Sequence, residues 1–267
     1  MYPFFELFGI TIYMTGIGVV VFVLTFVFLM NFYAKRYNVN FWRFFNWLPV
    51  FLILPYFFGS YLYHLFDSLL IIPLSINDLM LILSPYGYDF SFIGISLGLF
   101  LSTILFLKNV DIKNEQLKWI DIIFYSLSLA LVPFGFFLLL GDDFIGQPTN
   151  SFLGVSALIP ESFIYRFDQV YPVGLILSLV SILCFVLVFS MSYVLKKYGV
   201  GLLGFILLLL MLNFIFQFQL YSHNFGISMF GYNFDVKNYW TLILSGIILF
   251  YYFRYIKSKE IYNKNKG

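Results

Sequence analysis

Residues 170–195 read VYPVGLILSLVSILCFVLVFSMSYVL, and this stretch decides the fold class of the chain. It holds no charged side chain and is longer than the about 20 apolar residues that a helix needs to cross a bilayer. Similar runs recur along the chain, so we predict seven membrane-spanning helices, at 11–32, 46–66, 90–107, 119–140, 170–195, 200–220 and 239–256. The apolar segment 68–83 is too short and is interrupted by Pro73, so we expect an interfacial or re-entrant piece there.

The composition agrees with this reading and excludes several classes of protein. Of the 267 residues, 61% are hydrophobic and 10% are charged, against about 25% charged residues in a soluble domain. The net charge of +2 provides no basic excess for binding nucleic acid. A single cysteine, Cys184, allows neither an intramolecular disulfide nor a thiolate zinc site, and common metal, hydrolase and nucleotide motifs do not occur. We therefore expect an all-α polytopic membrane protein, one membrane domain over 1–267, without a metal or cofactor.

The basic residues predict how the helices are oriented, because short cytoplasmic loops collect lysine and arginine. Thirteen of the 15 fall in the loops after the first, third and fifth predicted spans and in the tail. They are Lys35, Arg36, Arg43, Lys108, Lys113, Lys118, Lys196, Lys197, Arg254, Lys257, Lys259, Lys264 and Lys266. The other side has Arg166 and Lys237 together with nine acidic residues. The N-terminus is thus expected outside and the C-terminus, with its short basic tail 257–267, in the cytoplasm.

The longest outer loop, 141–169, reads GDDFIGQPTNSFLGVSALIPESFIYRFDQ and mixes turn residues with aromatic ones. Such a loop is either a functional surface at the membrane or an ordinary extracellular connection. Asp143 can serve as a base near lipid, or it is a solvated acid that helps to set the topology. Arg166 can hold a lipid phosphate with two hydrogen bonds, or it forms an ion pair with Asp168.

Other polar residues lie within the predicted spans. His64 is three residues before Asp67, on the same helix face, which suits proton transfer or a simple interfacial histidine. Asn213 and Gln217 also share a face, and they either join helices by hydrogen bonds or line a lipid cavity. Gly94 allows two helices to pack closely.

The order of several short motifs resembles the prolipoprotein diacylglyceryl transferases, which are seven-span bacterial enzymes with an outer N-terminus. Residues 1–16 look like the opening segment of that family, and 91–98, SFIGISLG, look like its Ser-Phe-His-Gly-Gly-x-x-Gly stretch. Residues 133–135 and 143–149 look like shortened pieces of its Gly-Arg-x-Gly-Asn-Phe-x-Asn-Gly-Glu-x-x-Gly-x-Pro-Thr signature. Residues 169–171, Gln-Val-Tyr, are similar to its Gln-Leu-Tyr.

The resemblance implies transfer of a diacylglyceryl group from phosphatidylglycerol to the cysteine thiol of a lipoprotein precursor, in the bacterial cytoplasmic membrane. This chemistry needs a cation for the phosphate leaving group and a base that generates the thiolate. As a first hypothesis, Asp143 or His64 moves the proton. Lipid and phosphate would then be bound by Arg166, Gly94, Gly146, Thr149, Tyr171, Asn213 and Gln217.

The chain departs from the family at positions that carry the chemistry. The tyrosine before the first-span glycine is Thr15, the histidine is Ile93, and the signature asparagine is Asp143. The two arginines fall near Leu140 and at Asn213. A second hypothesis is therefore a non-catalytic relative that keeps the lipid cavity as a binding or assembly subunit. A third is an unrelated permease, although the first five spans hold few polar residues for a hydrophilic path.

Overall fold

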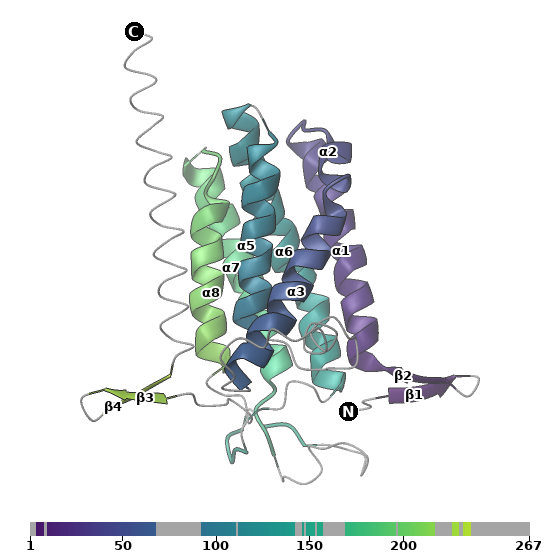
Figure 1. Ribbon diagram of the computed structural model, residues 1–267, viewed down its shortest axis with the longest axis vertical. Helices are drawn as coiled ribbons and strands as arrows, with labels where there is room; N and C mark the ends of the chain where they lie inside the picture. Colours follow the sequence, from purple (N-terminus) through teal and green to yellow (C-terminus); the bar gives the residue numbers. More distant parts are fainter. Residues whose placement is uncertain are drawn as a thin grey trace. The chain divides into compact units, whose positions relative to one another are not determined.

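The computed structural model describes residues 4–7, 10–67, 92–110, 112–141, 146, 148–152, 154–156, 169–195, 197–216, 226–229 and 232–235. They form long helices and two short β-hairpins (Figure 1). The chain divides into two compact units. Unit 1 comprises Met1–Asn38 and Lys118–Ser222, and unit 2 comprises Val39–Leu117 and His223–Gly267.

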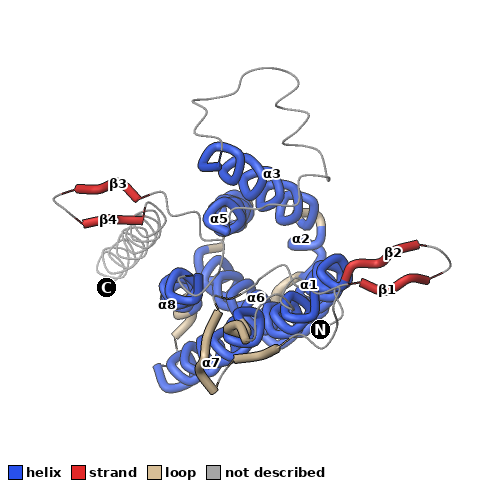
Figure 2. Tube along the Cα trace, turned by 90° about the horizontal axis from the view of Figure 1, so that it is seen from below, coloured by secondary structure: helices blue, strands red, loops and turns tan. Residues whose placement is uncertain are grey.

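Unit 1 contains a hairpin and four helices. Strands β1 (Phe4–Leu7) and β2 (Ile10–Tyr13) pair antiparallel, and α1 (Met14–Arg36) follows directly. The remaining helices are α6 (Lys113–Gly141), which belongs to unit 1 from Lys118 onward, α7 (Val173–Leu195) and α8 (Gly201–Phe216). Seen along their axes, these helices lie side by side (Figure 2).

Helix α6 is the most buried of the long helices in unit 1, with 56% of its apolar 18-residue stretch inside the protein. Its Tyr125 ring contacts Tyr33 of α1 and Phe185 of α7, at centroid distances of 5.5 and 5.7 Å. Small residues permit close approach elsewhere: a Cβ atom on Gly174 of α7 would meet the carbonyl oxygen of Gly135 of α6. Large aromatic rings and glycine contacts together hold α6 against its neighbours.

Unit 2 is built on the pair α3 (Leu48–Asp67) and α5 (Phe92–Lys108). A Cβ atom on Gly94 would meet the backbone of Phe58, and one on Gly98 would come within 2.5 Å of the Pro55 Cα, so both glycines are required by close helix packing. The Ser102 hydroxyl donates to the Val50 carbonyl across this contact at 3.1 Å. The short helix α2 (Phe41–Phe45) precedes α3, and β3 (Gly226–Met229) pairs with β4 (Tyr232–Asp235).

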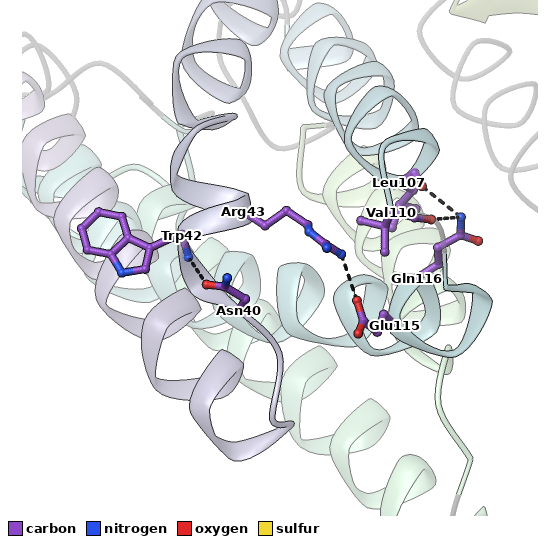
Figure 3. Close-up of polar contacts among 7 residues, drawn as sticks. All are labelled: Asn40, Trp42, Arg43, Leu107, Val110, Glu115 and Gln116. Atoms are coloured by element: carbon purple, nitrogen blue, oxygen red, sulfur yellow. Dashed lines mark hydrogen bonds and ion pairs between the residues drawn. The ribbon is translucent and has the colours of Figure 1, made fainter.

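Polar contacts join α2, α5 and the start of α6 (Figure 3). Arg43 of α2 forms an ion pair with Glu115 at 3.0 Å. The Gln116 amide donates to the carbonyl oxygens of Leu107 and Val110, at 3.0 and 2.6 Å. The turn between α5 and α6 is thus closed by a side chain that binds carbonyl groups at the end of α5.

Four helices in the described part of the chain are long and apolar enough to cross a membrane: Met14–Arg36, Phe41–Tyr61, Asn114–Gly141 and Val173–Leu195. Gly94–Lys108 and Gly201–Met211 are shorter apolar helices. These helices are consistent with the predicted all-α membrane protein, and they fall on six of the predicted spans. The segments 68–83 and 239–256 lie outside the described residues, so the number of seven spans stays a prediction.

Two of the differences between observed and predicted helix ends have a clear physical reason. The first helix begins at Met14 because residues 10–13 pair with β1, a short strand that hydropathy alone does not reveal. The fourth predicted span, 119–140, lies inside a helix that begins at Lys113, because the polar first turn of α6 is helical without being apolar.

Candidate functional site

The described part of the loop 141–169, which the charge pattern predicts to be outside, folds back onto the residues that lead into α7. Val155 and Val170 exchange two main-chain hydrogen bonds, of 2.9 and 3.0 Å. The Thr149 amide donates to the Gln169 carbonyl at 2.9 Å, and Pro148 forms a further bridge with Val170. The loop is therefore attached to the start of α7 by regular backbone pairing.

Two glycines make this close approach possible. A Cβ atom on Gly146 would meet the carbonyl oxygen of Tyr171, and one on Gly154 would come within 2.8 Å of the Gln169 side chain. Between them, the Thr149 hydroxyl accepts a hydrogen bond from the Ser151 amide at 3.0 Å, which fixes a local turn. The structure thus brings together three of the predicted site residues, Gly146, Thr149 and Tyr171.

Of the other predicted site residues, Gly94 is the one whose surroundings the structure describes. Gly94 lies in unit 2, where it packs α5 against α3. His64 is in α3 and Asn213 is in α8, but their side chains lie outside the described residues, as do Asp143, Arg166 and Gln217 entirely. The roles proposed for these five residues stay predictions.

An apolar groove of about 420 Å³ lies between α6 and α7. It is lined by Val132, Pro133, Phe136, Phe137, Leu175, Ser178, Leu179 and Ile182. The one hydroxyl in this lining, that of Ser178, donates to the Val132 carbonyl at 2.7 Å. The groove therefore suits a hydrocarbon chain and offers little to a hydrophilic solute.

The groove begins close to the loop attachment. Phe137 is four residues before the last residue of α6, which corresponds to about 6 Å along a helix. Leu175 is four residues after Tyr171, and Ile182 is about 10 Å further along α7. The loop segment around Gly146 and Thr149 and the groove thus adjoin the same ends of α6 and α7.

The opposite end of unit 1 is organised by Asp121, a residue that the sequence analysis did not select. Its carboxylate is fully buried, and it accepts hydrogen bonds from the amides of Gly199 and Gly201, at 2.8 and 2.7 Å. These amides lie at the N-terminus of α8, where a carboxylate also interacts favourably with the helix dipole. The sequence did contain a signal for this residue, since Asp121 is an acid inside the predicted span 119–140. Acids in such spans are rare and need a partner.

Cations and aromatic rings also make contacts at this end of unit 1. The Lys118 ammonium donates to the Tyr37 carbonyl at 3.0 Å and lies 5.5 Å from the centre of the Tyr198 ring. The Arg36 guanidinium lies 5.5 Å from the centre of the Phe189 ring of α7. The last residues of α1 and α7, the turn of α6 from Lys118 to Asp121 and the start of α8 therefore belong to one end of unit 1.

Comparison with known proteins gives no independent assignment: neither the family models nor the curated proteins include a match to this chain.

Proposed function

We propose that this chain is a seven-span protein of the bacterial cytoplasmic membrane that binds a phospholipid at the outer ends of α6 and α7. In this proposal it is a diverged relative of the prolipoprotein diacylglyceryl transferases that serves as a lipid-binding or assembly subunit. The headgroup, with phosphatidylglycerol as the first candidate, lies against the loop segment 146–149 and Tyr171, and one acyl chain lies in the groove between α6 and α7.

One observation carries the proposal: the backbone pairing that places Gly146 and Thr149 on Gln169–Tyr171, next to the groove. These two segments are also the two motif fragments that resemble the family, and about 20 residues separate them in the sequence. Their proximity in space supports a common site. The groove supplies an apolar surface of the kind that an acyl chain buries, at about 0.8 kcal/mol for each CH₂ group.

The distribution of charge supports the proposed orientation. In unit 1 the described basic residues of the helix ends, Lys35, Arg36, Lys118 and Lys197, belong to the end opposite to the outer loop. The positive-inside rule then assigns that end to the cytoplasm and the loop to the outer face. An outer N-terminus and an inner C-terminus follow if the segment 239–256 forms the seventh span.

Catalysis is the second candidate, and the same pairing of motif fragments favours it. In diacylglyceryl transfer a base removes the proton of the acceptor thiol, the sulfur forms a bond to the glyceryl carbon, and the carbon–oxygen bond to the phosphate breaks. The phosphate leaves with the electron pair of that bond. The acceptor thiol would belong to a lipoprotein precursor. Asp143 or His64 would be the base, and Arg166 would hold the phosphate.

Reconstitution separates these two candidates. The purified protein is incorporated into phosphatidylglycerol vesicles with a peptide that contains a lipobox cysteine, and mass spectrometry measures the peptide. A diacylglyceryl-modified thiol that is lost in Asp143→Ala, His64→Ala or Arg166→Ala supports the enzyme with these roles. Bound phosphatidylglycerol without turnover supports the binding subunit.

A pair of tryptophan variants tests the groove itself. Leu179→Trp places a large ring in the groove, whereas Leu187→Trp adds the same ring to an exposed position of α7 outside it. We expect native mass spectrometry to show less retained phospholipid for Leu179→Trp and unchanged retention for Leu187→Trp. Equal retention in both variants would refute the acyl-chain site.

A further inference from the structure

Among the described residues of unit 1, the end opposite to the loop 141–169 carries more exposed positive than negative charge. Its described cations are Lys35, Arg36, Lys118 and Lys197, which we call the cationic patch. In the described segments of unit 1 from Met14 onward, Asp121 is the one acidic residue. Because Asp121 is fully buried, it cannot form an ion pair with the exposed side chains of the cationic patch.

The hydrogen bonds of Asp121 strengthen this point. Both carboxylate oxygens accept main-chain amides, those of Gly199 and Gly201, and so they are committed to the α8 N-terminus. The neighbouring Tyr37 adds no negative charge, since burial and then the nearby Asp121 carboxylate raise its pKa above the usual value of about 10. Lys35, Arg36 and Lys197 are exposed, while Lys118 is half-buried.

Aromatic rings lie beside the cationic patch and hold one of its side chains in place. Tyr37 and Tyr198 meet edge to face at 5.7 Å, and Lys118 is held between the Tyr37 carbonyl and the Tyr198 ring. Tyr198 and Tyr193 are 51% and 79% exposed. Tyrosine at this exposure is typical of the boundary between bilayer and water, where its ring lies among headgroups and its hydroxyl in water.

We propose that the cationic patch binds anionic phospholipid headgroups of the leaflet next to it, with Arg36 and Lys197 contacting phosphate and Tyr198 lining the site. The partner is a membrane lipid because the patch lies at the ends of α1, α6 and α7, which are long and apolar enough to cross a bilayer. A guanidinium and an ammonium at the same end of unit 1 can each bind phosphate oxygens through charge-assisted hydrogen bonds. This site is separate from the outer lipid site, since the length of α6 lies between them.

Photo-crosslinking tests the proposal. The full-length protein is reconstituted in phosphatidylcholine vesicles with a subsaturating amount of phosphatidic acid that carries a photoreactive group near its headgroup. Cross-linked peptides are expected to come from the residues around 33–38 and 193–201. Each of Arg36→Gln and Lys197→Gln is expected to lower the cross-linking about fivefold, because one cation near an anionic surface contributes on this scale.

Two controls make the outcome decisive. Lys108→Gln removes the same charge from the end of another helix, in unit 2, and should leave these cross-links unchanged. Thr149→Val alters the outer lipid site and should also leave these cross-links unchanged. A protein that lacks the outer lipid site would therefore still show the cross-links expected for the cationic patch. Cross-links spread over all helix ends, or an equal loss in Lys108→Gln, would overturn the proposal. Because Arg36 and Lys197 are exposed, their variants are expected to fold normally.

Discussion

At the scale of single residues, Asp121 determines how α8 begins. Gly199 adopts a left-handed backbone with φ of 93°, which allows the chain to turn so that two amides point at one carboxylate. A helix N-terminus normally finds a capping acceptor in the preceding residues. Here the acceptor comes from α6, about 80 residues earlier in the chain, so a single side chain joins two helices and satisfies two buried donors.

Replacing Asp121 should therefore be costly. In Asp121→Ala the amides of Gly199 and Gly201 lose their acceptor inside the protein, and we expect a loss of stability of about 3 kcal/mol. Asp121→Asn keeps one acceptor oxygen and should lose about 2 kcal/mol. Thermal unfolding in detergent is measured with a dye that reacts with the buried thiol of Cys184 when the protein opens.

Ser128→Ala provides the matched control for Asp121. Ser128 is also fully buried on α6, but its hydroxyl bonds to the Tyr125 carbonyl of its own helix. Its loss should cost less than about 1 kcal/mol. If Asp121→Ala were as stable as Ser128→Ala, Asp121 would not be the acceptor on which the start of α8 depends.

Two glycines should respond in opposite directions to the same substitution. A Cβ atom on Gly174 would meet the backbone of α6, including the Leu139 amide nitrogen at 2.7 Å, which cannot move aside easily. We expect Gly174→Ala to destabilise the protein by about 2 kcal/mol. At Gly16 in the first turn of α1 the Cβ atom would meet nothing within 4 Å, so Gly16→Ala should stabilise by about 0.5 kcal/mol. Thermal unfolding followed by the Cys184 thiol measures both variants. A loss of stability in Gly16→Ala would contradict the open space beside Gly16.

At the scale of elements, the turn between α5 and α6 shows which polar contacts matter. The Arg43–Glu115 ion pair is partly exposed, with side-chain exposures of 40% and 30%, so water screens it. Gln116 instead binds two carbonyl groups, one of them that of the fully buried Val110. The neutral side chain should therefore contribute more to this turn than the charged pair.

This comparison gives a prediction for two alanine variants. Arg43→Ala should lower stability by about 0.5 kcal/mol, with a smaller difference at high salt. Gln116→Ala should lower it by about 2 kcal/mol, because the Val110 carbonyl loses its donor away from water. Thermal unfolding at 0.1 and 1 M NaCl distinguishes the two. An Arg43 variant less stable than the Gln116 variant would reverse the order proposed here.

Hydropathy was sufficient to predict the apolar helices, but not the short hairpins or the contacts between helices. A run such as 170–195 must be helical in lipid, since every backbone group needs an internal partner. Nothing in the spacing of Asp121, Gly199 and Gly201 shows that they meet, because that contact depends on how α6, α7 and α8 pack. Of the predicted site, Gly146, Thr149 and Tyr171 meet because a turn-rich loop returns to the start of α7.

At the scale of the whole molecule, the positions of the charged residues predict how the helices are oriented in the membrane. Lys118 is at the start of α6 and Lys197 follows the end of α7, so the two lie at the same end of unit 1. The loop attachment lies at the other end of these helices. An up-and-down arrangement of α6 and α7 thus agrees with the segregation of lysine and arginine that the sequence shows, and it sets the two proposed lipid sites on opposite faces of the bilayer.

Cysteine labelling tests this arrangement directly. In a Cys184→Ala background, Phe152→Cys places a thiol on the loop at a position that is 94% exposed, and Lys197→Cys places one at the exposed basic end. A maleimide that cannot cross membranes should label Phe152→Cys on intact cells, and Lys197→Cys after permeabilisation, because the positive-inside rule assigns the positive end to the cytoplasm. The reverse pattern would invert the topology. Labelling of both from outside would mean that α7 does not cross the membrane, which would remove the physical basis for two lipid sites in different leaflets.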